Sequence, residues 1–128
     1  MEHSTIKKEL VKLLRNNKEI EFIVDDAIKG VSGVKHKVDI HIVDPCDLAL
    51  VITHYDLKIE VIKAVVISID IHMPIILLVN ENNFLRCKEE LSEILETIPV
   101  KIITYSDKER NLMKAYHKIV RECERLSD

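Results

Sequence analysis

The sequence contains very little glycine, proline or aromatic residue. Among its 128 residues there are two Gly, three Pro, two Phe, three Tyr and no Trp. So few glycines and prolines leave little room for flexible linkers or low-complexity segments. With 47% hydrophobic and 32% charged residues, the composition is typical of a globular protein, and the length predicts a single domain spanning residues 1–128.

Cysteine is also scarce and irregularly spaced. Cys46, Cys87 and Cys123 are odd in number, lie far apart and form no CxxC pair. This pattern argues against a disulfide framework or a structural zinc site, so we expect reduced thiols in a cytoplasmic protein. The most apolar stretch, residues 61–79, is interrupted by charged residues and by Pro74, which predicts buried elements and no membrane span.

The chain has no overall excess of positive charge. Its net charge is −3 and its pI is about 6.1, whereas a dedicated nucleic-acid-binding protein is usually basic. Binding to DNA would therefore need a local patch. One candidate patch precedes the first long strand and comprises Lys29, Ser32, Lys35, His36 and Lys37. A second lies in the N-terminal segment, where Lys7, Lys8, Lys12, Arg15 and Lys18 are interspersed with glutamates.

Hydrophobic periodicity predicts an α/β fold. Helical spacing over residues 4–15 predicts a first helix, and alternation over 20–24 and 38–42 predicts two strands. Residues 48–52 are apolar on both faces, as in a central strand, and strands are also expected at 75–79 and 100–105. Further helices are expected from about Asp56, from about Leu85 and at the C-terminus. The order αβββαβαβα favours a mixed sheet. In the second helix, one apolar side is formed by Ile59, Ile62, Val66 and Ile69.

The segment Gly30-Val31-Ser32-Gly33-Val34-Lys35-His36-Lys37-Val38-Asp39-Ile40, together with this order, resembles archaeal and bacterial restriction-endonuclease-like proteins. That family includes type II restriction enzymes, Mrr-like endonucleases and archaeal Holliday-junction resolvases. Its core runs α-β-β-β-α-β, which corresponds to residues 4–79 of this chain. The resemblance implies a restriction-endonuclease-like mixed sheet and, because both DNA strands must be cut, a homodimer.

The resemblance also implies a catalytic site. In that family an aspartate on the second strand and an acidic-x-Lys triplet on the third bind Mg²⁺, which activates the attacking water. Asp39 matches the strand aspartate. We expect Val38, Ile40 and Ile42 to face the core, so Asp39 and His41 would share the opposite face and could both bind a metal.

The second half of the catalytic motif is missing. If Pro45-Cys46 is a two-residue loop, Asp39 lies opposite Ile52. The motif positions then fall at Leu50 and Ile52, and a one-residue bulge would move them to Val51 and Thr53. Neither register supplies the carboxylate or the lysine that the motif requires.

A migrated site would draw on residues from two helices. Glu60 and Lys63 of the second helix and Glu9 of the first are the candidates to join Asp39, with Mg²⁺ as the cofactor only if the protein is catalytic.

Three functions follow from these observations. We expect a catalytically degenerate nuclease-fold protein that binds nucleic acid or a protein partner. The first alternative is a metal-dependent DNA endonuclease with a migrated site. The second is a flavodoxin- or receiver-like regulatory or assembly domain, which would need a parallel sheet. A surplus of apolar residues in 48–52 and 61–73 adds to the expectation of a homodimer.

Overall fold

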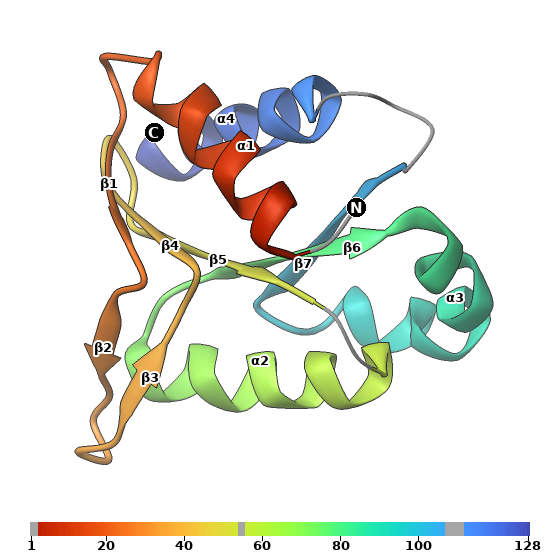
Figure 1. Cartoon of the computed structure of the whole chain (residues 1–128). Helices are drawn as coiled ribbons and strands as arrows, with labels where there is room; N and C mark the ends of the chain where they lie inside the picture. Colours follow the sequence, from red (N-terminus) through yellow and green to blue (C-terminus); the bar gives the residue numbers. More distant parts are fainter. Residues whose placement is uncertain (1–2, 54–55, 107–111) are drawn as a thin grey trace.

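The computed structural model describes residues 3–53, 56–106 and 112–128. A five-stranded sheet lies between two pairs of helices (Figure 1). The helices are α1 (His3–Arg15), α2 (Leu57–Ile71), α3 (Glu81–Leu95) and α4 (Met113–Ser127). The strands are β1 (Glu21–Val24), β2 (Ala27–Lys29), β3 (Lys35–Lys37), β4 (Ile40–Asp44), β5 (Leu48–Ile52), β6 (Ile75–Asn80) and β7 (Val100–Tyr105). No helix among the described residues is both long and apolar enough to cross a membrane.

The main sheet has the strand order β1-β4-β5-β6-β7. Strands β1, β4 and β5 pair antiparallel, whereas β5, β6 and β7 pair parallel. The prediction of an α/β fold with a mixed sheet is therefore confirmed. The antiparallel pairing of β4 with β5 is incompatible with the wholly parallel sheet of a flavodoxin-like domain.

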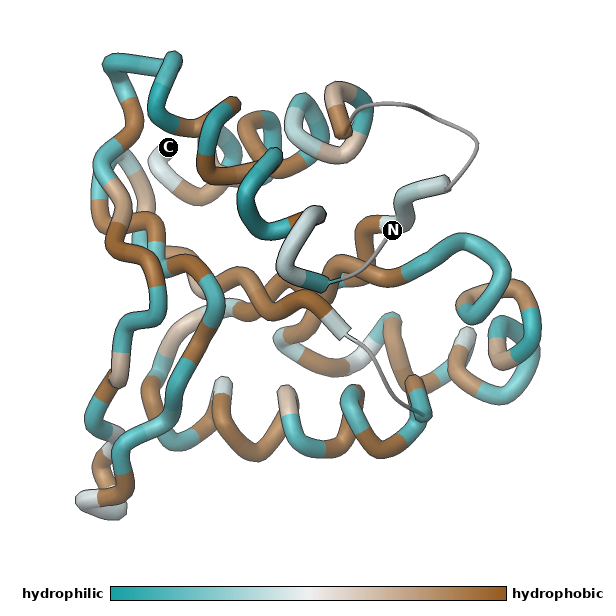
Figure 2. The backbone as a smooth tube through the Cα atoms, in the orientation of Figure 1, coloured by the Kyte–Doolittle hydropathy of each residue, from teal (hydrophilic) through white to brown (hydrophobic). Residues whose placement is uncertain are grey.

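Two hydrophobic cores cover the two faces of this sheet. Helices α1 and α4 pack on one face, against Ile40, Ile42 and Leu50, while α2 and α3 pack on the other, against Leu77 and Val79. Strands β5 and β6 contribute side chains to both cores, because the sheet is covered on both sides. Their continuous apolar character is visible in the brown central strands of Figure 2.

A two-stranded antiparallel ribbon projects beyond the main sheet. It consists of β2, β3 and the loop between them, residues 27–37, and we refer to it as the ribbon. The sequence predicts only a turn here, because strands of three residues rich in lysine resemble a loop in periodicity. Apart from the ribbon, the elements follow the predicted order.

Helix α2 buries a different side from the one its sequence suggests. Its buried residues are Leu57, Val61, Ala64 and Ser68. The stripe of Ile59, Ile62, Val66 and Ile69 is exposed. Hydropathy could not choose between the two sides because both carry apolar residues. We attribute the choice to the small residues Ala64 and Ser68, which let the helix approach the sheet closely.

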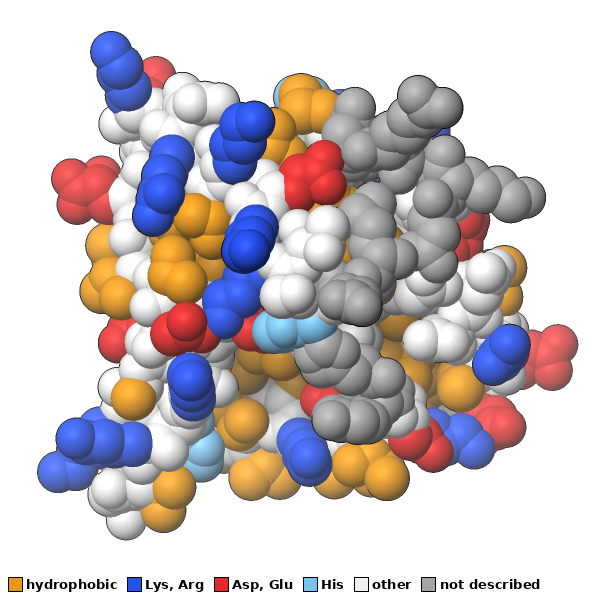
Figure 3. All heavy atoms as spheres, in the orientation of Figure 1, with side chains coloured by type: hydrophobic (Ala, Val, Ile, Leu, Met, Phe, Trp, Pro, Cys, Tyr) orange, Lys and Arg blue, Asp and Glu red, His pale blue; other side chains and the backbone are white. Residues whose placement is uncertain are grey.

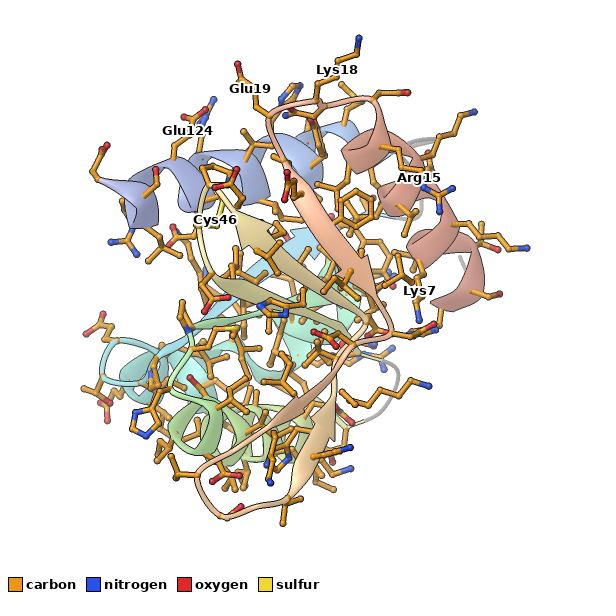
Figure 4. All side chains as sticks on the ribbon, turned by 90° about the vertical axis from the view of Figure 1, so that its left-hand side faces the viewer. Lys7, Arg15, Lys18, Glu19, Cys46 and Glu124 are labelled. Carbon is orange, nitrogen blue, oxygen red and sulfur yellow. A yellow bond between two sulfur atoms is a disulfide. The ribbon has the colours of Figure 1, made fainter. Side chains whose placement is uncertain are left out.

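The expectation of three reduced thiols is wrong. Cys46 in the β4–β5 loop and Cys123 in α4 form a disulfide across a sequence separation of 77 residues, and Figure 4 shows Cys46 beside α4. Cys87 is a free, half-buried cysteine. Spacing along the chain does not reveal which residues the fold brings together. Disulfides occur in oxidising compartments and also in intracellular proteins of hyperthermophiles, so a cytoplasmic location stays a prediction.

Candidate nucleic-acid interface

The chain passes twice between the main sheet and the ribbon, at Asp25-Asp26 and at Val38-Asp39. We call these four residues the joint. The Asp25 amide donates to the Asp39 carbonyl and the Val38 amide to the Asp26 carbonyl, both at 2.9 Å. The two crossings are thereby bonded to each other, and Asp25 adopts a positive φ of 55°.

A bulge at Asp39 changes the direction in which its side chain points. The Asp39 amide donates to the carbonyl of Leu50 at 3.1 Å, and Ile40 is the paired partner of that same residue. Two residues of one strand thus oppose one residue of the other. As a result, Val38 packs with α2 and α3 while Ile40 packs with α1 and α4. The expectation that Asp39 and His41 share a face is therefore wrong.

The Asp39 carboxylate is surrounded by donors and cations. It accepts a hydrogen bond from the Ile52 amide at 2.8 Å. His3 Nε2 lies 2.9 Å from Asp39 Oδ1, and Lys7 Nζ lies 3.4 Å from it. The Lys7 ammonium also bonds to Asp25, so two carboxylates of the joint share one cation.

The pKa values of the joint follow from this arrangement. Burial alone would lower the pKa of Lys7, but the hydrogen bond to Asp25 and the charges of Asp39 and Asp25 outweigh it and raise that pKa. The hydrogen bond from Lys7 lowers the pKa of Asp25. Both groups are therefore charged at neutral pH.

This donor set does not fit a resident Mg²⁺ ion. A divalent cation needs several free oxygen ligands, but the carboxylates of Asp25 and Asp39 are already engaged by Lys7 and His3. Across residues 3–53, 56–106 and 112–128, no group of three or more His, Cys, Asp or Glu side chains is placed to hold a metal.

The candidates for a migrated site lie apart from these contacts. Glu9 of α1 and Glu60 of α2 are half-buried, and Lys63 of α2 is exposed. None of the described contacts of the Asp39 carboxylate involves them. The carboxylate that does come close to Asp39 is Asp25, through Lys7, and it is not among the residues predicted from the sequence. The pair Asp25-Asp26 directly after a strand was the available signal.

His41 belongs to a separate cluster at the other side of β4. Its Nδ1 lies 2.8 Å from Asp26 Oδ2, and its Nε2 lies 2.6 Å from Asp47 Oδ1. Burial alone would lower the pKa of His41, but the bonds to Asp47 and Asp26 outweigh this and raise it. The raised pKa favours the imidazolium, in which both nitrogens can donate, so His41 links β4 to the joint and to the hairpin loop and does not lie beside Asp39.

We expect this cluster to make stability depend on pH. Because the folded-state pKa of His41 is raised, its contribution is complete below its ordinary pKa of about 6.5. That contribution is lost as the pH rises through the raised value. Thermal melts should show a smaller difference between wild type and Asp26→Asn at pH 9 than at pH 5.5. Asp44→Asn, an exposed neighbour at the end of β4, serves as the control, and an Asp26→Asn deficit independent of pH would contradict this role.

The inner face of the ribbon is tied to α2 by Asp70. The Asp70 carboxylate accepts from the Ser32 hydroxyl at 2.7 Å and from the Ser32 amide at 2.9 Å. His36 Nε2 lies 2.7 Å from it. The pKa of Asp70 is lowered to about 2. The hydrogen bond from the Ser32 hydroxyl is the largest cause, followed by those from the His36 ring and the Ser32 amide. Ser32 and His36, predicted to bind nucleic acid, therefore hold the ribbon to the end of α2.

Gly30 is needed for this attachment. A Cβ atom at this position would lie 2.0 Å from Asp70 Oδ2 and 2.2 Å from its Cγ. We expect Gly30→Ala to lower the free energy of unfolding by about 1–3 kcal/mol, the usual cost of overpacking, with faster amide exchange in the ribbon. In an Asp70→Ala background the same substitution should lower the free energy of unfolding only slightly. An equal loss of stability in both backgrounds, measured by thermal melting, would contradict this contact.

The outer face of the ribbon carries three exposed lysines. Lys29 pairs directly with Lys35 across the ribbon, and Lys37 pairs with Ala27. All three lysines alternate with Ile28 and His36, which are half-buried. Like charges directly opposite each other on two strands destabilise a ribbon. A bound anion would relieve that repulsion.

Three further cations line a groove between α1 and β1. Lys8, Lys12 and Arg15 border a shallow hollow of about 520 Å³, to which Val11 and Val24 contribute apolar surface. We define the basic face as the six exposed cations Lys8, Lys12, Arg15, Lys29, Lys35 and Lys37. Figure 3 shows Lys and Arg side chains over both α1 and the ribbon on one side of the molecule. Within the described part of the chain no ion pair involves any of these six.

No protein-family model matches this chain, and no match is found among curated proteins or among solved structures. What the chain does must therefore be inferred from the chemistry of its own residues.

Proposed function

We propose that this protein binds duplex DNA through the basic face, on a restriction-endonuclease-like framework without the catalytic set of that family. The observation that carries the proposal is the basic face, six exposed cations on α1 and the ribbon, none of which forms an ion pair with another described residue. Phosphate contacts by Lys and Arg supply most of the affinity of non-specific DNA binding. A net charge of −3 does not oppose this, because local potential attracts the phosphates at distances within the Debye length of about 8 Å.

The shape of the ribbon favours DNA over RNA. The major groove of B-DNA admits a two-stranded β-ribbon, whereas the major groove of an RNA duplex is too narrow for side chains to read. The loop of the ribbon also exposes two apolar side chains, Val31 at 77% and Val34 at 55%. These valines are placed to pack against thymine methyl groups or sugars once the lysines contact phosphate.

We propose the restriction-endonuclease-like framework because of the element order. With the ribbon strands left aside, the order α1-β1-β4-β5-α2-β6 follows the α-β-β-β-α-β core of that family. The absence of catalysis is proposed from two observations. Strand β5 offers only apolar side chains at positions 48–52, and the Asp39 carboxylate is already engaged by Lys7, His3 and the Ile52 amide.

The test is a fluorescence titration of the full chain with DNA and RNA duplexes of one sequence, between 50 and 300 mM salt. If the six cations contact phosphates, log K should fall with log salt at a slope of about −5. DNA should bind more tightly than RNA. Lack of binding to DNA at 50 mM salt would overturn the proposal.

A parallel incubation with Mg²⁺ or Mn²⁺ tests catalysis. We expect the DNA to stay intact and the melting temperature of the protein to be unchanged by the metal. Cleavage that disappears in Asp39→Ala would replace the proposal with a metal-dependent endonuclease that uses Asp39 and Asp25.

A further inference from the structure

The loop that joins β2 to β3 exposes two valine side chains. We call residues 31–34 the tip, and Figure 1 shows this loop at the edge of the molecule. Val31 is 77% exposed and Val34 is 55% exposed. Single exposed apolar residues are common on protein surfaces, but these two share a small projecting ribbon with three exposed lysines, and Val34 directly precedes Lys35. Such a surface suits a ligand in which phosphates lie beside apolar groups.

The hydrogen-bond donors of the tip are used within the protein. The amides of Val31 and Ser32 donate to Asp70, each at 2.9 Å. The Gly33 amide donates to the carbonyl at the start of the loop at 3.0 Å. The Val34 amide donates to the Ser32 hydroxyl at 3.3 Å, and that hydroxyl donates to Asp70 at 2.7 Å. Apart from its carbonyl oxygens, the tip therefore meets a ligand with the methyl groups of its two valines.

The same bonds fix the conformation of the tip. Its turn places Gly33 at a φ of 91°, a conformation that glycine adopts without steric cost. A binding element that is already ordered loses little conformational entropy when it meets its ligand. The two valines are therefore presented in a fixed position next to the lysines.

The major groove of B-DNA contains an apolar group that matches these valines. The base edges there present the acceptors N7, O6 and O4, which need a donor, and the C5 methyl group of thymine, which needs an apolar contact. The tip has its donors occupied and its methyl groups exposed. The thymine methyl is therefore the base-edge group that the tip fits best.

We propose that Val31 and Val34 recognise thymine methyl groups in the major groove, so that the ribbon prefers sequences that contain thymine. This inference rests on the proposed DNA binding and adds a sequence preference to it. The two tasks fall to different side chains of the ribbon. Phosphate contacts by its lysines give affinity for any sequence, whereas contacts to base edges distinguish one sequence from another.

The test is a fluorescence titration of the full chain with two duplexes of one sequence, one with thymine and one with deoxyuridine at the same positions. The duplexes have the same phosphates and the same hydrogen-bonding groups, and they differ only in the C5 methyl. Burial of one methyl group contributes about fourfold to affinity. If each valine contacts one methyl, the thymine duplex should bind about 15-fold more tightly.

A second pair of duplexes separates the methyl group from the shape of the DNA. One duplex contains cytosine and the other contains 5-methylcytosine, which carries its methyl at the same ring position on a G·C base pair. We expect the methylated duplex to bind more tightly. A preference for thymine without one for 5-methylcytosine would mean that the shape of the A·T duplex is recognised, and would overturn the inference.

Two double variants locate the effect on the protein. In Val31→Ala/Val34→Ala the preference for thymine should fall to within about threefold, while the slope of log K against log salt stays unchanged because the lysines remain. Val43→Ala/Val66→Ala is the matched control. It removes the same atoms from two valines outside the ribbon that are 40% and 59% exposed, and it should keep the preference of the wild type.

The measurement on the wild type decides the inference even if a variant does not fold. Equal binding of the thymine and deoxyuridine duplexes would overturn it and leave the proposed DNA binding intact, because contacts to sugar and phosphate do not distinguish the two. A preference that survives in a folded Val31→Ala/Val34→Ala variant would place the recognition elsewhere and would also overturn it. Absence of binding to all four duplexes would overturn the proposed function, and this inference with it.

Discussion

Removal of the Cys46–Cys123 disulfide should lower the free energy of unfolding by about 4 kcal/mol. The bond closes a loop of 77 residues, and in the chain-entropy description a long closed loop removes much of the freedom of the unfolded chain. Both cysteines are buried and connect the β4–β5 loop to α4. We therefore expect the Cys46→Ala/Cys123→Ala variant to melt about 15 °C below the wild type.

The same result should follow from a reducing agent alone. The wild type in the presence of a reductant should melt near the temperature of the double variant, which should not respond to the reductant itself. Cys87→Ala removes the free thiol and should retain the full response to the reductant. Alkylation of the unfolded, unreduced protein that labels all three cysteines would show that the disulfide does not form.

Replacement of the three ribbon lysines should weaken DNA binding by up to about 500-fold at 0.1 M salt. This value assumes that each of Lys29, Lys35 and Lys37 contacts one phosphate and so contributes about 0.9 to the slope of log K against log salt. It also assumes that the affinity at 1 M salt is the same for the variant and the wild type. The slope should accordingly change from about −5 to about −3 in Lys29→Ala/Lys35→Ala/Lys37→Ala. The ribbon should stay folded, because these side chains face solvent and Asp70 holds the other face.

A matched variant separates this local effect from a change in net charge. Arg86→Ala/Lys88→Ala/Lys118→Ala removes three exposed cations from α3 and α4 and alters the net charge by the same amount. It should bind DNA within a few-fold of the wild type and keep the original slope. Equal losses in the two triple variants would mean that overall charge, and not the basic face, attracts the DNA.

The order of the main elements could be predicted because each has a clear local signal. Strands β5 and β6 are continuous apolar runs, and β4 alternates between buried and more exposed residues. The ribbon had no such signal. Its strands are three residues long, and they are held by Asp70, which lies 38 residues from Ser32 along the chain.

The candidate site shows the same division. Lysines at positions 29, 35 and 37 were recognised as a basic patch because charge is a property of the residues themselves. The attachment of Ser32 and His36 to α2 has no such local signal, because the carboxylate that binds them is that of Asp70, far along the chain. The surroundings of Asp39 depended on a bulge, and a shift of one residue in a strand reverses the direction of its side chain.

The sequence by itself determined the fold class, the order of helices and main strands, and the positions of the lysines. Periodicity and charge are local properties, and they can be recognised in a segment without knowing which distant segments it contacts. Only the tertiary structure decided which side of α2 is buried, that Cys46 meets Cys123, and that Lys7 lies between Asp25 and Asp39. Each of these depends on a contact between residues far apart in the chain, and such contacts are selected by packing of the whole domain rather than by any local pattern.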